Sequence, residues 1–336
     1  MATIKDVARH AGVSVATVSR VINGSPLTKP DTADLVKRTM RDLGYRPNAA
    51  ARTLVSKRSL AIGVVVADVS DPFFGSLVKH VDTIAHQQGH HLLIGNGYHE
   101  AAREKQAIES LIQNQVASLI VHSKALDDDT LRDFSEEHGA MVFINRLIPG
   151  LEDRCIFLDN YRGAFLATEH LIEQGHRYVA YIGSSHPIED TVQRQQGYED
   201  ALNTYRVTDE THPVMMAFDT PDETGGERAM AKLMADNPRL SAVFCYNDIM
   251  AAGAMTALTD RDFRVPEDVS VVGFDDSLIA RYLHPKLTSV RYPIEEMAAL
   301  AAEQAIALSS QEPMRDEKGN YTPTLIKRNS VAKPSE

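Results

Sequence analysis

Short apolar runs recur along the chain from residue 60 to residue 274, and most segments between them have the apolar spacing of helices. Nine such runs span residues 60–67, 91–94, 117–121, 141–144, 156–158, 179–182, 214–218, 242–245 and 269–274. Continuous Val, Ile and Leu strands joined by helices are typical of parallel sheets that helices cover on both faces. Because nine strands are too many for one compact unit, the pattern predicts an α/β fold with two doubly wound subdomains.

The residues before this region lack such runs and instead show three short amphipathic stretches. Thr3 and Asp6 have the spacing of a capping box at the start of a first helix. Ser14 has the position of an N-cap before a second helix over residues 15–23, and a short turn with a glycine separates the two. A third helix is expected between residues 28 and 44. Two helices joined in this way are typical of a helix-turn-helix, so we predict an all-α head.

The head also differs in charge from the rest of the chain. The 336 residues carry a net charge of −11, but residues 1–58 hold 11 Lys and Arg against 4 Asp and Glu, which gives +7 there and −18 in the remainder. A basic segment of this size favours a polyanion such as DNA, whereas the acidic remainder would be repelled by one. The alternative is a helical cap whose basic face is simply solvated.

Several strings in the sequence resemble one known family. They are TIKDVARHAGVSVATVSRVING and LGYRPNAAARTL in the head, and VVADVSDPFFGSLVK, CYNDIMAAGAM and VVGFDDSLIARY further on. These strings resemble the lactose/galactose repressor family of bacterial transcription regulators, the galactose-responsive members above all, and the resemblance extends over the whole chain. It implies a DNA-binding head over residues 1–46, a hinge helix or linker over 47–58, and a periplasmic-binding-protein-like core over 59–336.

The resemblance also implies how the core is divided. The N-lobe would comprise about residues 60–160 and 292–321, and the C-lobe about residues 161–291 and 322–330. The chain would then cross between the lobes three times, near Asn160, Tyr292 and Thr322.

Residues 47–54 (PNAAARTL) have the start signals and alanine content of a helix, but their length allows only about two turns. Helices this short are marginal in water, so we expect the segment to be helical only when docked. The resemblance implies that two such hinge helices pair over the minor groove of DNA, and that Leu54 matches an apolar wedge that kinks the duplex. Packing of Leu54 between linker and core is the alternative.

The residues expected to contact DNA combine the outer face of the second helix with the helix caps and the hinge. They are Thr3, Ser14, Val15, Ala16, Thr17, Ser19, Arg20, Asn23, Asn48, Ala51 and Leu54. Val15 and Ala16 are short and apolar, which suits thymine methyl groups, whereas Arg20 suits hydrogen bonds to a guanine.

Polar side chains follow several of the predicted strands. They include Asp71, Asn145, Asn247 and Asp275. Ligands of open α/β sheets bind beyond the carboxyl ends of the strands. Carboxylate and amide groups suit the neighbouring hydroxyls of a sugar, and the Phe73-Phe74 pair would offer an apolar face to its C–H groups. Each of these polar residues alone has the alternative role of a helix N-cap or turn residue.

The resemblance assigns effector contacts to the same part of the core. The implied effector-binding residues are Asp71, Phe73, Phe74, Asn145, Arg194, Asn247, Asp275 and Tyr292. Arg194 matches the arginine of an Arg-x-x-Gly-aromatic motif of the family. The loop over residues 218–226 carries a further aromatic contact in relatives, and which residue would provide it here stays open.

The sequence does not indicate an enzyme, a membrane protein or a secreted protein. The strings GxxxxGK[ST], GxGxxG, HExxH and GxSxG are absent, so we expect no enzyme activity, no cofactor and no metal site. The longest apolar run, residues 61–67, is far too short to cross a membrane, and the N-terminus lacks the apolar region of a signal peptide. We therefore expect a cytoplasmic, nucleoid-associated protein whose two cysteines, Cys155 and Cys245, are buried free thiols.

Together these features predict a homodimeric repressor of sugar-utilisation genes. It is expected to bind pseudopalindromic double-stranded operator DNA and to leave it when a small sugar, D-galactose by resemblance, occupies the core. A member of the same family that responds to another ligand is one alternative, and a sugar-binding protein without a regulatory role is another. Residues 330–336 contain no apolar heptad, which predicts dimers rather than tetramers held by a C-terminal helix.

Overall fold

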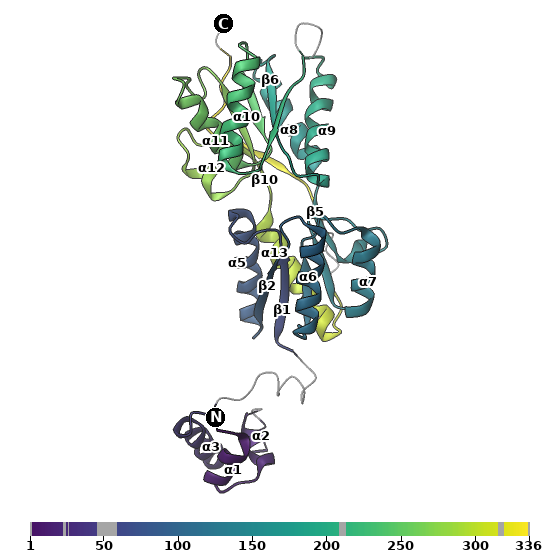
Figure 1. Cartoon of the computed structure of the whole chain (residues 1–336), viewed down its shortest axis with the longest axis vertical. Helices are drawn as coiled ribbons and strands as arrows, with labels where there is room; N and C mark the ends of the chain where they lie inside the picture. The colour runs from purple at the N-terminus through teal and green to yellow at the C-terminus, as the bar shows by residue number, and fades with distance from the viewer. Residues whose placement is uncertain are drawn as a thin grey trace. The chain divides into compact units, whose positions relative to one another are not determined.

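A computed structural model describes residues 2–22, 25, 27–45, 59–207, 213–314 and 319–334. The contacts within the chain divide it into two compact units, a head (Met1–Ser59) and a core (Leu60–Glu336). Figure 1 labels the α-helices of both units and some of the strands of the core. Across the described ranges, no helix is both long and apolar enough to span a bilayer.

Three helices form the head: α1 (Ile4–His10), α2 (Val15–Ile22) and α3 (Pro30–Asp42). The predicted capping box is present, because the Asp6 N–H donates to Thr3 Oγ1 (3.3 Å) and the Thr3 N–H donates to Asp6 Oδ2 (3.0 Å). Val7, Val18 and Val36 come from one helix each, are fully buried and form the centre of a small apolar core. The amphipathic spacing of the sequence is therefore satisfied by packing the three helices on one another.

The core contains two six-stranded sheets, and we call each sheet with its helices a lobe. The first sheet has the order β11-β5-β4-β3-β1-β2, with all neighbouring strands parallel. Its strands are β1 (Ala61–Val66), β2 (His91–Asn96), β3 (Ser118–Val121), β4 (Met141–Ile144), β5 (Cys155–Leu158) and β11 (Asn320–Tyr321). The helices of this first lobe are α5 (Pro72–Gln87), α6 (Ala101–Gln113), α7 (Asp128–His138) and α13 (Ile294–Ser310), with a 3-10 turn, η1 (Glu152–Arg154).

Helices cover both faces of this sheet. Ile62 and Val64 of β1 belong to the same apolar cluster as the buried side chains of α5 and α13, whereas Val65 belongs to a cluster with those of α6 and α7. Successive side chains of a strand point to opposite faces. The continuous apolar runs of the sequence are thus explained by burial on both sides.

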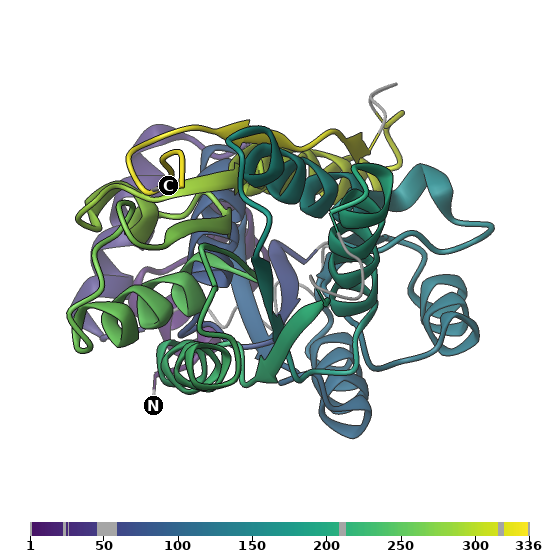
Figure 2. The same cartoon turned by 90° about the horizontal axis from the view of Figure 1, so that it is seen from above.

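The second sheet has the order β12-β10-β9-β8-β6-β7, in which only β10 and β12 pair antiparallel. Its strands are β6 (Val179–Ser184), β7 (Met215–Asp219), β8 (Ala242–Cys245), β9 (Ser270–Asp275), β10 (Thr288–Arg291) and β12 (Thr324–Ile326). The helices of this second lobe are α8 (Asn160–Glu173), α9 (Glu189–Thr204), α10 (Glu223–Asp236), α11 (Asp248–Thr259) and α12 (Leu278–Tyr282). The pair α8 and α9 packs on one face, and the pair α10 and α11 packs on the other (Figure 2).

All nine predicted runs are strands, and their ends differ by at most two residues from the expected ones. The runs did not predict β10, β11 and β12, which are two to four residues long and partly polar. These short strands adjoin the connections between lobes. The chain passes from one sheet to the other between β5 and α8, between β10 and α13, and between β11 and β12.

Candidate effector cleft and DNA-binding helix

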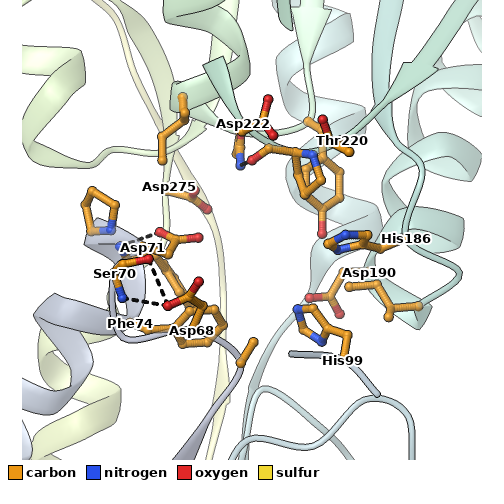
Figure 3. Close-up of a pocket in the computed structure, with 18 of the residues that line it drawn as sticks. Asp68, Ser70, Asp71, Phe74, His99, His186, Asp190, Thr220, Asp222 and Asp275 are labelled. Carbon is orange, nitrogen blue, oxygen red and sulfur yellow. Dashed lines mark hydrogen bonds between the residues drawn. The ribbon is translucent and has the colours of Figure 1, made fainter. Parts of the chain in front are cut away.

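A cleft with a volume of about 480 Å³ lies between the two lobes of the core. Segments that follow or end strands β1 to β4 and β6 to β9 line it, so it lies at the carboxyl ends of strands from both sheets. Figure 3 shows Asp68 and Asp71 on one side of this space, with His99 and His186 on the other. Its size and position are those of a small-molecule site in an α/β protein.

Seven of the eight predicted effector residues line this cleft. They are Asp71, Phe73, Phe74, Asn145, Arg194, Asn247 and Asp275. Tyr292 is not part of the lining and lies behind it, where its hydroxyl donates to Asn145 Oδ1 and its ring packs edge-on against Phe73 at 4.9 Å between centroids. Tyr292 therefore supports two lining residues.

Arg194 is almost fully buried and is held on several sides. Its Nε donates to Asn160 Oδ1 (2.9 Å) and its Nη1 donates to the carbonyl oxygen of Tyr246 (2.6 Å). The guanidinium carbon lies 3.7 Å from the ring centroid of Phe274, and Nη2 lies 4.0 Å from Asp275 Oδ1. A guanidinium has five N–H donors, so this arrangement fixes the group while leaving donors for a ligand.

Two of the polar lining residues also cap helices, and a third has an uncommon backbone conformation. Asp71 caps α5 by accepting from the Phe73 N–H (2.8 Å), and Asn247 caps α11 by accepting from the Met250 N–H (2.8 Å). Asp275 has a positive φ of 103°, which is uncommon outside glycine. Burial raises the pKa of Asp275 well above its ordinary value, and the nearby Arg194 offsets this only in part. Asp71 and Asn247 therefore act as helix N-caps, which was the alternative role, and they also line the cleft.

The sequence interpretation missed one buried carboxylate in the lining. Asp190, in the first turn of α9, accepts from Asn145 Nδ2 (2.8 Å) and from Lys124 Nζ (2.6 Å). Burial alone would raise the pKa of Asp190, but Lys124 and Arg194 lower it to about 2. Asp190 precedes Arg194 by one helical turn, and this spacing is the signal that would have pointed to it.

Three histidines in the cleft were also missed. His99, His122 and His186 follow β2, β3 and β6, and the ring of His99 lies 5.7 Å from that of His122 and 5.3 Å from that of His186. Burial lowers the pKa of all three, which favours neutral imidazoles with one donor and one acceptor nitrogen each. Their positions just beyond strand ends were the available signal.

The predicted aromatic contact from residues 218–226 takes a different form. Phe218 is the one aromatic residue of this segment, and its ring packs against Tyr181 outside the cleft. The segment instead lines the cleft with Thr220, Pro221, Asp222 and Glu223.

The side chains that commonly bind metal ions are not clustered in the part of the chain that the structure describes. No three His, Cys, Asp or Glu residues there are placed to hold a metal ion. Cys155 and Cys245 are buried free thiols, and burial raises the pKa of Cys155 to about 11.

The second helix of the head exposes one face, which includes both apolar and polar side chains. Val15 is 42% exposed, Ala16 and Arg20 are exposed, and Ser19 is half-buried, whereas Val18 is fully buried. Arg20 forms no ion pair with another described residue. These positions leave one face of α2 available for a partner.

The other predicted DNA contacts fall into two groups. Thr3, Ser14 and Thr17 serve in helix caps, since Thr3 bonds with Asp6 and the Thr17 N–H donates to Ser14 Oγ (3.1 Å). Asn23, Asn48, Ala51 and Leu54 lie outside the described residues, as does the predicted hinge helix.

Both parts of the chain match known proteins. Residues 3–48 match the model of the bacterial regulatory proteins of the lacI family, and residues 168–331 match that of the periplasmic binding protein-like domain. The HTH-type transcriptional regulator GalR of Escherichia coli (strain K12) is 50% identical over 335 residues, which cover 100% of this chain and 97% of that protein. The chain belongs to the lacI family of bacterial regulatory proteins.

Further transcription regulators are similar to this chain over nearly its whole length. The regulator GalS of Salmonella typhimurium (strain LT2) is 51% identical and covers 99% of this chain and 97% of its own length. The solved Lac repressor dimer bound to operator and the anti-inducer ONPF has a TM-score of 0.84 at 26% identity, with 98% of this chain and 99% of that chain covered. The CelR–cellobiose complex has a TM-score of 0.70 at 31% identity, with 98% and 100% covered. This lacI-family chain is a sugar-responsive DNA-binding transcription regulator and not an enzyme.

Proposed function

We propose that this protein represses genes of galactose utilisation and leaves its operator when D-galactose binds in the cleft between the lobes. The observation that carries the proposal is the lining of that cleft, which joins carboxylates, an amide and a guanidinium with the rings of Phe73 and Phe74. Such a set suits a small sugar, because hydroxyls both donate and accept while the C–H face of the ring is apolar. The similarity to galactose repressors supports D-galactose within this class.

We assign the sugar contacts to the lining residues that point into the cleft from both lobes. Asp71 and Asn145 belong to the first lobe, and Arg194, Asn247 and Asp275 belong to the second. A sugar that bonds to both groups at once would favour one spacing of the lobes over others. Tyr292 contributes by holding Asn145 and Phe73 in place.

We assign operator recognition to the exposed face of α2. The N-terminal end of a recognition helix faces base edges in the major groove, so Val15 and Ala16 would lie beside thymine methyl groups. Arg20, in the last turn of α2, has a side chain that suits hydrogen bonds to a guanine. Asn48, Ala51 and Leu54 would add minor-groove contacts. Two heads on a homodimer would read a pseudopalindrome, and a protein that reads operator DNA acts in the cytoplasm at the nucleoid.

The sugar and the operator would act on one another by linkage. If they prefer different arrangements of the same dimer, each weakens the binding of the other by the same factor. No covalent chemistry is needed, and the protein returns to the operator when the sugar dissociates.

The proposal is tested by selecting binding sites from random duplex DNA with the full chain, and then titrating sugars against the bound duplex by fluorescence anisotropy. We expect a pseudopalindromic site, release by D-galactose, and weaker release by D-glucose and D-ribose. Release by a different ligand alone would identify another effector within the family. Failure to select any site would favour the sugar-binding protein without a regulatory role.

Assembly is tested separately by sedimentation of the complex with operator. We expect two chains per operator, because two helix-turn-helix heads are needed for a pseudopalindrome. A stable complex of one chain with the full operator would contradict the proposed mode of recognition.

A further inference from the structure

One lysine reaches from the first lobe to the second beside the cleft. Lys124 lies in the loop after β3, and its side chain is 2% exposed. Its Nζ lies 2.6 Å from Oδ1 of Asp190 and 3.9 Å from Oε2 of Glu189, both in the first turn of α9 in the second lobe. The lobes are therefore joined by a buried ion pair, whose charges attract one another with less screening by solvent than those of an exposed pair.

The loop that carries Lys124 is itself held firmly. Glu104 on α6 is 1% exposed, and its carboxylate accepts from the Ser123 hydroxyl and from the backbone N–H groups of Lys124, Ala125 and Leu126. A carboxylate that accepts four hydrogen bonds leaves the loop little freedom. The direction in which the lysine projects is thus set by the fold of the first lobe.

Asp190 connects Lys124 to a residue of the cleft, because it bonds to both Lys124 and Asn145. Its second oxygen accepts from Asn145 Nδ2 (2.8 Å), and Asn145 Oδ1 accepts from the Tyr292 hydroxyl at a connection between the lobes. Asn145, Asp190 and Arg194 all line the cleft, whereas Lys124 does not. Lys124 therefore does not line the cleft itself but forms an ion pair with Asp190, which does, and so fixes the position of Asp190.

The ion pair of Lys124 and Asp190 also lies between the cleft and a second cavity. This second cavity has a volume of about 270 Å³ and is lined by Lys124, Asn145 and Asp190 among others. Asn145 and Asp190 line both this cavity and the cleft. If the lobes moved apart here, water would reach the ammonium and the carboxylate from two sides, so the pair favours the arrangement in which the lobes are in contact.

We propose that Lys124 is a positioning residue of the effector site, which holds Asp190, and through it Asn145 and α9, in the closed arrangement of the lobes that binds the sugar. The inference rests on the proposed function, since it takes the cleft as the sugar site. Loss of Lys124 would weaken sugar binding without altering the DNA-contacting face of the head.

The test compares Lys124→Met with wild type in the full chain. Lys105→Met is the matched control, because Lys105 lies on α6 in the same lobe in an exposed pair with Glu109 (4.0 Å). D-Galactose affinity is measured by calorimetry, and operator affinity without sugar by anisotropy. We expect Lys124→Met to lose about tenfold or more in sugar affinity. Its operator affinity without sugar should not fall, because the operator prefers a different arrangement of the dimer. Both affinities of Lys105→Met should stay within about twofold of wild type.

A second variant separates positioning from the cost of an unpaired buried charge. Lys124→Met with Asp190→Asn removes both charges, and we expect it to fold and still to bind sugar about tenfold or more weakly. Wild-type sugar affinity in either variant overturns the proposal, as does a joint loss of sugar and operator affinity in Lys124→Met that the double variant restores. Wild type that binds operator but ignores D-galactose contradicts the proposed function instead.

Discussion

The head and the cleft present their functional side chains in opposite ways. On α2, Val15, Ala16 and Arg20 project into solvent. In the cleft, Asp190 and Arg194 are nearly fully buried and bonded to other residues of the core. A helix that reads DNA needs free groups, because the duplex supplies their partners, whereas a cleft between lobes must hold its polar groups in place before the ligand arrives.

This difference determines what a substitution disturbs. A change on the outer face of α2 removes an interaction with an external partner and leaves the core of the head intact. A change in the cleft also removes an internal partner from residues such as Asn160 or Asn145. We therefore expect substitutions on α2 to change DNA binding alone, and substitutions in the cleft to change both the sugar affinity and the stability of the core.

The largest effect is expected for Arg194→Ala. Removal of the guanidinium leaves Asn160 and the carbonyl of Tyr246 without a donor and removes a group that faces the sugar. Sugar affinity should fall by roughly 1.5–3 kcal/mol, more than tenfold, and the melting temperature of the core should drop as well. Operator affinity without sugar should persist, which would give a repressor that D-galactose cannot release.

Arg264→Ala is the matched control, since Arg264 is exposed and pairs with Asp268 at the surface. It should leave sugar affinity unchanged. Release of Arg194→Ala from operator at the wild-type sugar concentration would remove Arg194 from the site. A joint loss of sugar and operator binding would make it a structural residue only.

The second largest effect is expected for Arg20→Ala, which tests DNA recognition by the head. The loss of a bidentate contact to a guanine should weaken specific binding by about 1–3 kcal/mol and relax the preference at one base pair. Competition between operator and non-specific duplex measures this directly. The melting temperature and sugar affinity should stay at wild-type values. Full operator preference in the variant would mean that α2 is not the recognition helix.

A smaller effect, which depends on pH, is expected for Asp248→Asn in the core. Asp248 is fully buried and accepts from the Ser289 hydroxyl (2.6 Å) and the Ser277 N–H (2.7 Å). Burial raises the pKa of Asp248 to about 7. Because the folded-state pKa lies above the unfolded one, the stabilising contribution of the protonated group is lost as the pH rises through about 7.

Asn does not titrate, so the free energy of unfolding of the variant should increase relative to that of wild type as the pH rises. The difference in unfolding free energy between variant and wild type should shift in favour of the variant by about 1 kcal/mol or more from about pH 5 to about pH 8. Denaturant titrations at several pH values measure it. A difference that is constant with pH would show that Asp248 stays ionised throughout.

The smallest effect is expected for Thr3→Ala in the head. It removes the side-chain acceptor of the capping box on α1, which costs typically ~1 kcal/mol. Thr3→Ser keeps the hydroxyl and should restore the stability of the head. Thermal unfolding followed by circular dichroism separates the two variants, and equal melting temperatures for Ala and Ser would mean that the cap contributes nothing.

The amino-acid sequence determined the features that depend on neighbours a few residues apart. The capping box of Thr3 and Asp6, the helical spacing of the head and the nine apolar strands all follow from local patterns, and all are present. The polar residues after the strands could also be identified from the sequence, because each closely follows or ends an apolar run. Parallel strands end at a common edge, so Asp71 and Asn145 lie beyond the strands of the first sheet, and Asn247 and Asp275 lie at the strand ends of the second.

Only the tertiary structure decided which distant side chains meet across the lobes. Lys124 and Asp190 are 66 residues apart, and Asn145 and Tyr292 are 147 apart, so no local spacing relates either pair. The short strands β10, β11 and β12 were not predicted because each has only two to four residues and is partly polar, so pairing within the sheets, rather than an apolar run, defines them as strands. Local periodicity specifies elements, but contacts between lobes depend on strand order and on how two sheets are joined, which are set by packing over the whole core.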